Sequence, residues 1–152
     1  MKQTDDIQTM VKTRAQECIA VRIRLLSRMI THVYDSAMKP YGVKLNQMSM
    51  LALVFMKSGI GFEAICKRLK MEKSTASRNI ERLKKAGWLE VAHAHDERKK
   101  VLRVTPAGET LLREVHGAWE KAQAEAEKLL GSAGAAAICR CADEIWSRDR
   151  RR

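Results

Sequence analysis

Apolar residues recur at helical spacing along the first quarter of the chain. From Cys18 through Val33 to Ala37 they form one continuous stripe with arginines beside it, which predicts a single long helix. This helix is expected to follow a frayed start and to reach about Lys39. Pro40 disfavours helical backbone at the residue before it, so the helix should end there.

A second helical segment, 47–57, is apolar nearly all round and is expected to form the buried centre of the domain, with Asn46 as its cap. A shorter helix with an apolar inner face is expected over 62–69. A three-residue turn, 70–72, then leads into a much more polar helix. Two helices joined by so tight a turn, the second with a polar front, make a helix-turn-helix.

The helix expected between Met71 and Gly87 has two different sides. Ala76, Ile80 and Leu83 fall on one side, at the spacing of a buried stripe. The opposite side carries hydroxyls and cations, namely Ser74, Thr75, Arg78, Arg82 and Lys85. Hydroxyl and lysine side chains reach phosphate oxygens, and arginine pairs with a guanine edge. This front therefore suits the groove of a DNA duplex.

Two short stretches rich in β-forming residues follow, 88–93 and 101–104, and the segment between them is almost wholly polar. They predict a β-hairpin with a basic tip, which could reach an adjacent minor groove. Helix should resume with Thr105 as the cap and Pro106 as the first residue. Gly131 is expected to separate this helix from a last, Ala-rich one.

The charge of the chain favours a nucleic-acid partner. Twenty-nine Lys and Arg residues against 18 Asp and Glu give a net charge of +11, and the pI is about 9.8. The excess is densest in 62–86, which has eight basic and three acidic residues, whereas 105–152 has eight of each. An acidic protein partner would also suit such a surface.

Other classes of protein lack their sequence signals. No nucleophile elbow, phosphate-binding loop or dinucleotide turn occurs, so neither an enzyme nor a cofactor is expected. His93 and His95 are too few ligands for a closed zinc site, and no metal is expected. The chain has no apolar run long enough to span a membrane and no signal-peptide core. Its four cysteines lie in helical patterns, which predicts free thiols and a cytoplasmic protein.

Several short motifs stand in a fixed order. Lys73, Ser74, Thr75, Ser77 and Arg78 are followed by Arg82, Leu83 and Gly87, then by Asp96 and Arg98, and then by Val104-Thr105-Pro106-Ala107-Gly108. Over nearly the whole chain this order resembles the MarR family of bacterial transcription regulators. The chain departs from the family pattern in three places. Glu97 replaces an arginine at the wing tip, Val91 and Ala92 stand where an arginine is frequent, and Glu72 replaces an aspartate before the polar helix.

The resemblance implies a mainly α-helical fold with a small β-hairpin wing (α+β). A winged helix-turn-helix domain, 46–105, would lie between an N-terminal dimerisation helix, 1–39, and C-terminal dimerisation helices, 106–149. The protein would be a homodimer that binds a pseudo-palindromic operator in double-stranded DNA, as a repressor released by a small aromatic or anionic ligand. Its DNA-binding residues would be Lys73, Ser74, Thr75, Ser77, Arg78, Arg82, Arg98, Lys99 and Lys100.

Two alternatives stay open at this stage. Some MarR relatives sense peroxide through a cysteine near the start of the first helix, and Cys18 lies in that region. A redox-sensing regulator is therefore one alternative, although a cysteine in an apolar stripe is more often a small hydrophobic residue. The other alternative is a basic winged-helix module that binds an acidic protein.

Overall fold

The computed structural model describes residues 2–93 and 100–149. In chain order its elements are α1 (Lys2–Glu17), α2 (Ile19–Met38), the 3-10 helix η1 (Lys39–Tyr41), α3 (Leu45–Met56), α4 (Phe62–Leu69), α5 (Lys73–Lys85), β1 (Leu89–His93), β2 (Lys100–Val104) and α6 (Pro106–Asp149). The fold is mainly helical with a two-stranded antiparallel wing, which confirms the fold class predicted from the sequence.

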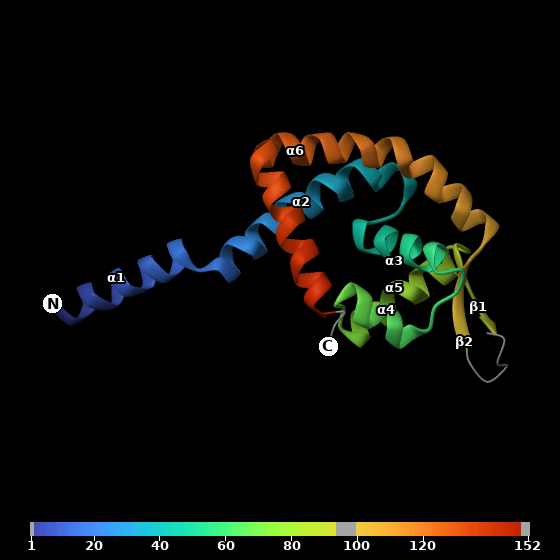
Figure 1. Ribbon diagram of the computed structural model, residues 1–152, viewed down its shortest axis with the longest axis horizontal. Coiled ribbons are helices and arrows are strands. Elements are labelled where there is room, and N and C mark those ends of the chain that lie inside the picture. Colours follow the sequence, from blue (N-terminus) through green and yellow to red (C-terminus); the bar gives the residue numbers. More distant parts are fainter. Residues whose placement is uncertain (1, 94–99, 150–152) are drawn as a thin grey trace.

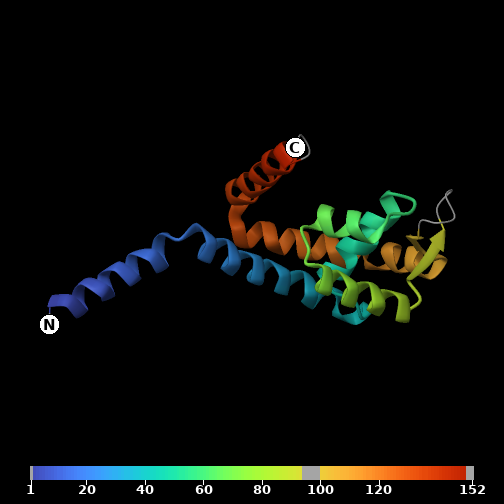
Figure 2. The ribbon, with the colours of Figure 1, turned by 90° about the horizontal axis from the view of Figure 1, so that it is seen from below.

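Helices α3, α4 and α5 and the two strands form one body, and α2 and the first half of α6 lie side by side against it (Figure 1). Helix α1 projects away from this body in both views (Figure 2). Helix α6 bends sharply at Gly131, where φ is 69° and ψ is 153°, and its second half turns back toward α4. This bend lies where the sequence predicted a boundary between two helices.

The hydrophobic core surrounds α3, as the sequence predicted. Met50, Leu51 and Val54 of this helix are fully buried and pack with residues of α2, α4, α5 and α6. The prediction fails at the C-terminal end of α3, where Phe55 is 49% exposed and Met56 is 71% exposed. An apolar pattern around a helix predicts burial, but it cannot show where the helix leaves the core.

The start of α3 differs from the prediction. The helix begins at Leu45, with Lys44 as the cap residue, so the expectation that Asn46 caps it is wrong. The Lys44 backbone N–H donates to Gln47 Oε1 at 3.0 Å, and the Leu45 N–H donates to Asp35 Oδ1 at 2.7 Å. Asp35 belongs to α2, so one N–H at this helix end is satisfied by a neighbouring helix.

The N-terminal helix also differs from the prediction. Helix begins as early as Lys2, and the chain then breaks at Cys18, whose φ of −68° and ψ of 109° are extended, so α1 and α2 are separate helices. The Arg22 guanidinium spans the break, and its Nε donates to the Gln16 carbonyl at 2.7 Å. Cys18 therefore does not lie inside a continuous helical stripe.

The junctions on either side of the wing follow local sequence signals. Gly87 has a φ of 77°, and the N–H groups of Gly87 and Trp88 donate to the carbonyls of Lys84 and Leu83, which is the Schellman pattern that ends a helix. Thr105 Oγ1 accepts the Gly108 N–H at 3.1 Å, so Thr105 caps α6 as predicted. The same hydroxyl donates to the Gly87 carbonyl at 2.6 Å, which joins the end of α5 to the start of α6.

The wing has a third segment that the sequence did not reveal. Strands β1 and β2 pair from Leu89 with Val104 to His93 with Lys100. Ile60, in the loop before α4, exchanges two backbone hydrogen bonds with Leu102, of 3.2 and 2.9 Å. The loop predicted only as a helix break therefore also anchors β2 to the body.

Candidate nucleic-acid interface

Helix α5 is fixed to the body by its apolar side. Ala76 and Leu83 are completely buried and Ile80 nearly so, which confirms the stripe predicted from the sequence. Asn79 is also buried, and its Nδ2 donates to the Thr75 carbonyl at 3.1 Å, one turn earlier in the same helix. With four buried side chains along 13 residues, α5 cannot rotate about its axis without opening the core.

The other side of α5 faces solvent. Ser74, Ser77, Arg78, Arg82 and Lys85 are exposed, and we call these five side chains the α5 front. Thr75, which the sequence placed on the front, is half-buried at its edge. The turn before α5 sets the direction of the helix: Lys70 ends α4 with a φ of 50°, a left-handed conformation usually taken by glycine. In this turn the left-handed position is occupied by Lys70, not by the glycine that such turns often contain.

Two acidic residues that the sequence analysis did not single out lie beside the cations of α5. Glu63 Oε1, on α4, lies 2.6 Å from Lys73 Nζ, and Glu81 Oε1 lies 3.0 Å from Lys84 Nζ. Glu81 could have been found from the sequence, because residues three apart on a helix are neighbours. The approach of Glu63 to Lys73 depends on how α4 and α5 pack, which no local spacing shows.

The wing carries the remaining predicted contacts. Lys100 is exposed at the start of β2, opposite His93, and Arg103 is exposed on the same strand opposite Glu90. Arg98 and Lys99 lie outside the residues that the structure describes. Of the wing cations predicted from the sequence, Lys100 alone is therefore placed, at the end of the described hairpin away from its base.

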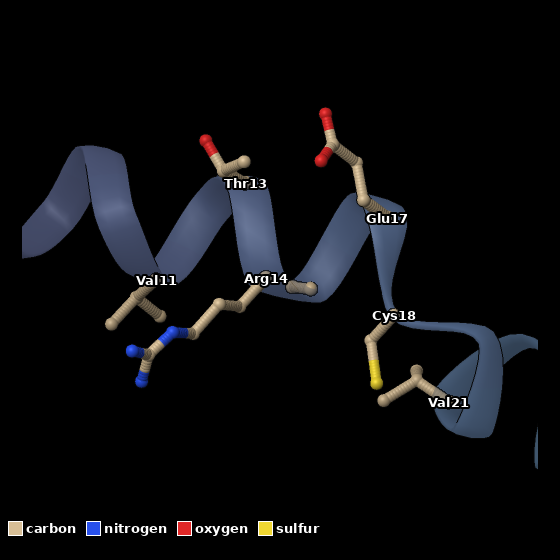
Figure 3. A pocket seen from close by; sticks show the side chains of 7 residues that line it. Val11, Thr13, Arg14, Glu17, Cys18 and Val21 are labelled. Carbon is tan, nitrogen blue, oxygen red and sulfur yellow. The ribbon is translucent and has the colours of Figure 1, made fainter.

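A separate hollow of about 600 Å³ lies at the break between α1 and α2 (Figure 3). Arg14, Cys18 and Val21 point to one side of the chain there, and Thr13 and Glu17 point to the other. Cys18 is half-buried and its thiol is free. The role of Cys18 as a redox sensor stays a prediction.

Within the described ranges, no group of three or more His, Cys, Asp or Glu side chains is arranged to hold a metal ion. None of the described helices has the length and apolar character needed to cross a membrane.

Comparison with known protein families finds one match. Residues 44–108 match the model of a winged helix DNA-binding domain. This span contains α3, α4, α5, both strands of the wing and the first residues of α6. No curated protein sequence matches the chain.

Solved structures with a similar fold cover most of the chain. A mutant of MarR from E. coli, complexed with operator DNA, has a TM-score of 0.76 and 16% identity, over 88% of this chain and 96% of that one. MosR from M. tuberculosis has a TM-score of 0.73 and 23% identity, over 88% and 98%. BpsR from Bordetella bronchiseptica, whose DNA binding is regulated by 6-hydroxynicotinic acid, has a TM-score of 0.73 and 21% identity, over 86% and 95%.

Proposed function

From its winged helix DNA-binding domain and its MarR-family fold, we propose that the chain is a sequence-specific transcriptional repressor. It would act as a homodimer on double-stranded DNA. The MarR-family regulators are a non-enzymatic family. The observation that carries the proposal is the α5 front, a set of hydroxyls and cations held outward by a helix whose back is buried. The front lies inside the span that matches a DNA-binding domain.

In this proposal α5 enters the major groove. Arg78, in the middle of the exposed side, reads a base edge, because a guanidinium pairs in bidentate fashion with guanine. Ser74 and Ser77, in the first turns of the helix, donate to phosphate oxygens, and Arg82 makes a phosphate or base contact one turn after Arg78. The phosphate contacts would position the helix on the duplex, and the base contacts would recognise the DNA sequence.

The wing supplies a second set of contacts in the proposal. Lys100 lies at the free end of the described hairpin, and Arg98 and Lys99 precede it in the sequence. A basic hairpin next to a helix in the major groove reaches the neighbouring backbone or minor groove. The negative potential there attracts arginine and lysine side chains.

The homodimer is supported by apolar surface that one chain leaves open. Side chains at helical spacing are exposed along α1 and the first half of α2, at Ile7, Met10, Val11, Ile19, Val21, Ile23, Leu25, Leu26 and Met29. An isolated 16-residue helix such as α1 is marginal in water without a surface to pack on. A second copy of the chain provides an equivalent apolar surface, and two-fold pairing would present two α5 fronts about 34 Å apart.

Control of DNA binding by a small ligand is supported by analogy with a structural neighbour. The DNA binding of BpsR is regulated by 6-hydroxynicotinic acid, which is a small aromatic acid. We extend this chemistry to the present chain: a small aromatic or anionic ligand would weaken its hold on the operator.

Selection from a pool of random duplexes tests the function. A DNA reader should enrich a pseudo-palindrome and prefer it to random duplex by about 10³ or more. The logarithm of its binding constant should also fall linearly with the logarithm of salt concentration. Equal affinity for every duplex, with tight binding to an acidic protein instead, would identify the chain as a basic interaction module and contradict the proposal.

A further inference from the structure

Glu63 and Lys73 form an ion pair at the edge of the proposed DNA surface. Glu63 lies in the first turn of α4 and Lys73 is the first residue of α5, and Oε1 and Nζ are 2.6 Å apart. Both side chains are exposed, Glu63 by 77% and Lys73 by 70%. The hydrogen bond from Lys73 lowers the pKa of Glu63, and the same bond raises the pKa of Lys73, so both groups are charged near neutral pH.

The N-terminal ends of α4 and α5 have opposite effects on the charges of Glu63 and Lys73. The positive end of a helix dipole favours a carboxylate, as at Glu63, and disfavours an ammonium group, as at Lys73. No acidic residue lies in the first turn of α5, and the carboxylate that compensates the Lys73 ammonium belongs to Glu63 of α4. An exposed pair of this kind contributes about 0–1 kcal/mol to folding stability, so stability alone is a weak reason for it.

The pair has a larger consequence for binding. A lysine that meets a phosphate releases a counterion and strengthens binding to any duplex, whatever its sequence. The Lys73 ammonium already has a carboxylate partner at hydrogen-bond distance, so a phosphate must either displace that partner or share the ammonium with it. In both cases the Glu63 carboxylate would stand beside the DNA backbone, where like charges repel.

We propose that Glu63 limits the DNA affinity of the α5 surface by holding the Lys73 ammonium, so that Lys73 becomes a full phosphate contact only when the Glu63 charge is removed. The inference rests on the proposed function, because it requires α5 to meet a duplex. It assigns Glu63 a positioning role: the carboxylate reduces sequence-independent attraction and leaves the base contacts of the α5 front unchanged. A repressor with weaker general attraction is held less by non-specific DNA.

The test measures affinity for the selected operator and for random duplex across a range of salt concentrations. Glu63→Gln keeps the shape of the side chain and removes its charge. It should tighten binding to both duplexes by a similar factor, about 3–10-fold near 0.15 M salt, and steepen the salt slope by about 0.9 for each bound chain. Lys73→Gln alone should change the slope by much less than this, because in the wild type Glu63 holds the Lys73 ammonium and Lys73 makes no full phosphate contact. The double variant should lose the gain of Glu63→Gln.

Glu144→Gln is the matched control. Glu144 forms an exposed pair with Arg148 on α6, with 3.6 Å between the charged atoms, and its loss changes the net charge by the same amount. It should leave both affinity and slope unchanged. The inference is overturned if Glu63→Gln binds like the wild type, or if Lys73→Gln alone lowers the slope by about 0.9 for each bound chain, because Lys73 would then already contact phosphate. A wild-type protein with no preference for any duplex would overturn the proposed function itself, and this inference with it.

Discussion

At the residue scale, the proposed role of Arg78 as a base reader rests on its place on a helix whose opposite side is buried in the core. Arg78→Ala should lower the preference for the operator over random duplex by about 10–100-fold, because a bidentate base contact discriminates by about 1–3 kcal/mol. The salt slope should change little. Paired gel-shift titrations measure both quantities.

Arg113→Ala serves as the control for this prediction, because Arg113 is exposed on α6 and pairs with Glu109 at 3.3 Å. It removes the same charge and should bind as the wild type does. If Arg78→Ala instead lowered the slope by about one for each bound chain and kept the preference, Arg78 would be a phosphate contact. No change in either quantity would remove Arg78 from the interface.

Tyr34 offers a second prediction at this scale, on stability. Its hydroxyl is buried between α2 and α6 and donates to Gln123 Oε1. Burial, and then the nearby Glu127 and Cys139, raise the pKa of Tyr34. The folded state therefore holds this proton more tightly than the unfolded chain, where the pKa is about 10. The contribution to stability is complete below about pH 10 and is lost as the pH rises through the folded-state pKa.

Urea unfolding at several pH values checks the Tyr34 prediction. Tyr34→Phe should cost about 1 kcal/mol at neutral pH and should show less loss of stability above pH 10 than the wild type. Identical pH profiles for Tyr34→Phe and the wild type would contradict the prediction.

At the scale of elements, Gly108 sets how closely α6 starts beside the end of α5. A Cβ at Gly108 would collide with the Trp88 carbonyl oxygen and lie 2.7 Å from Val104 Cγ1. Gly108→Ala should therefore destabilise the fold by about 1–3 kcal/mol. Gly117→Ala, later in the same helix, meets nothing within 4 Å and should stabilise by about 0.5–1 kcal/mol. Thermal unfolding of the two variants should show shifts of opposite sign, and equal shifts would refute the close approach.

The elements that the sequence predicted correctly depend on neighbouring residues. The end of α5 at Gly87, the cap at Thr105 and the bend at Gly131 are local signals, and so is the buried stripe of α5. The hairpin was predicted from two stretches rich in β-forming residues, and the helix-turn-helix from two helical segments joined by a tight turn. The exposed front of α5 was also predicted from residue spacing along the helix. Spacing predicts exposure only approximately, and Thr75 is half-buried.

The features that were missed depend on contacts across the chain. Asp35 caps α3 from α2, Ile60 pairs with β2, and Glu63 reaches Lys73 from α4. The break at Cys18 was missed for a different reason, since the apolar positions continue across it without a glycine or proline. Periodicity detects a stripe, but it does not show whether the helix that carries the stripe is interrupted.

At the scale of the whole molecule, operator binding by two α5 fronts requires two chains. Leu25 is 57% exposed on α2, in an apolar face that the single chain leaves uncovered. Leu25→Glu should shift the protein from dimer to monomer and weaken operator binding, because a charge would be buried between the copies. Arg24→Gln, at the exposed neighbouring position, lowers the net charge equally and should keep the dimer. Sedimentation at several concentrations measures the change, and a wild-type protein that stays a single chain at every concentration would contradict it.

The central claim is that two α5 fronts, held by one two-fold dimer, bind DNA one helical turn apart. Hydroxyl-radical footprinting of the selected operator, with the number of chains per duplex measured in parallel, tests it most directly. The account predicts two protected patches about 10 base pairs apart, related by the symmetry of the site, and two chains per duplex. A single patch with one chain bound, or uniform protection without a pattern, would contradict it.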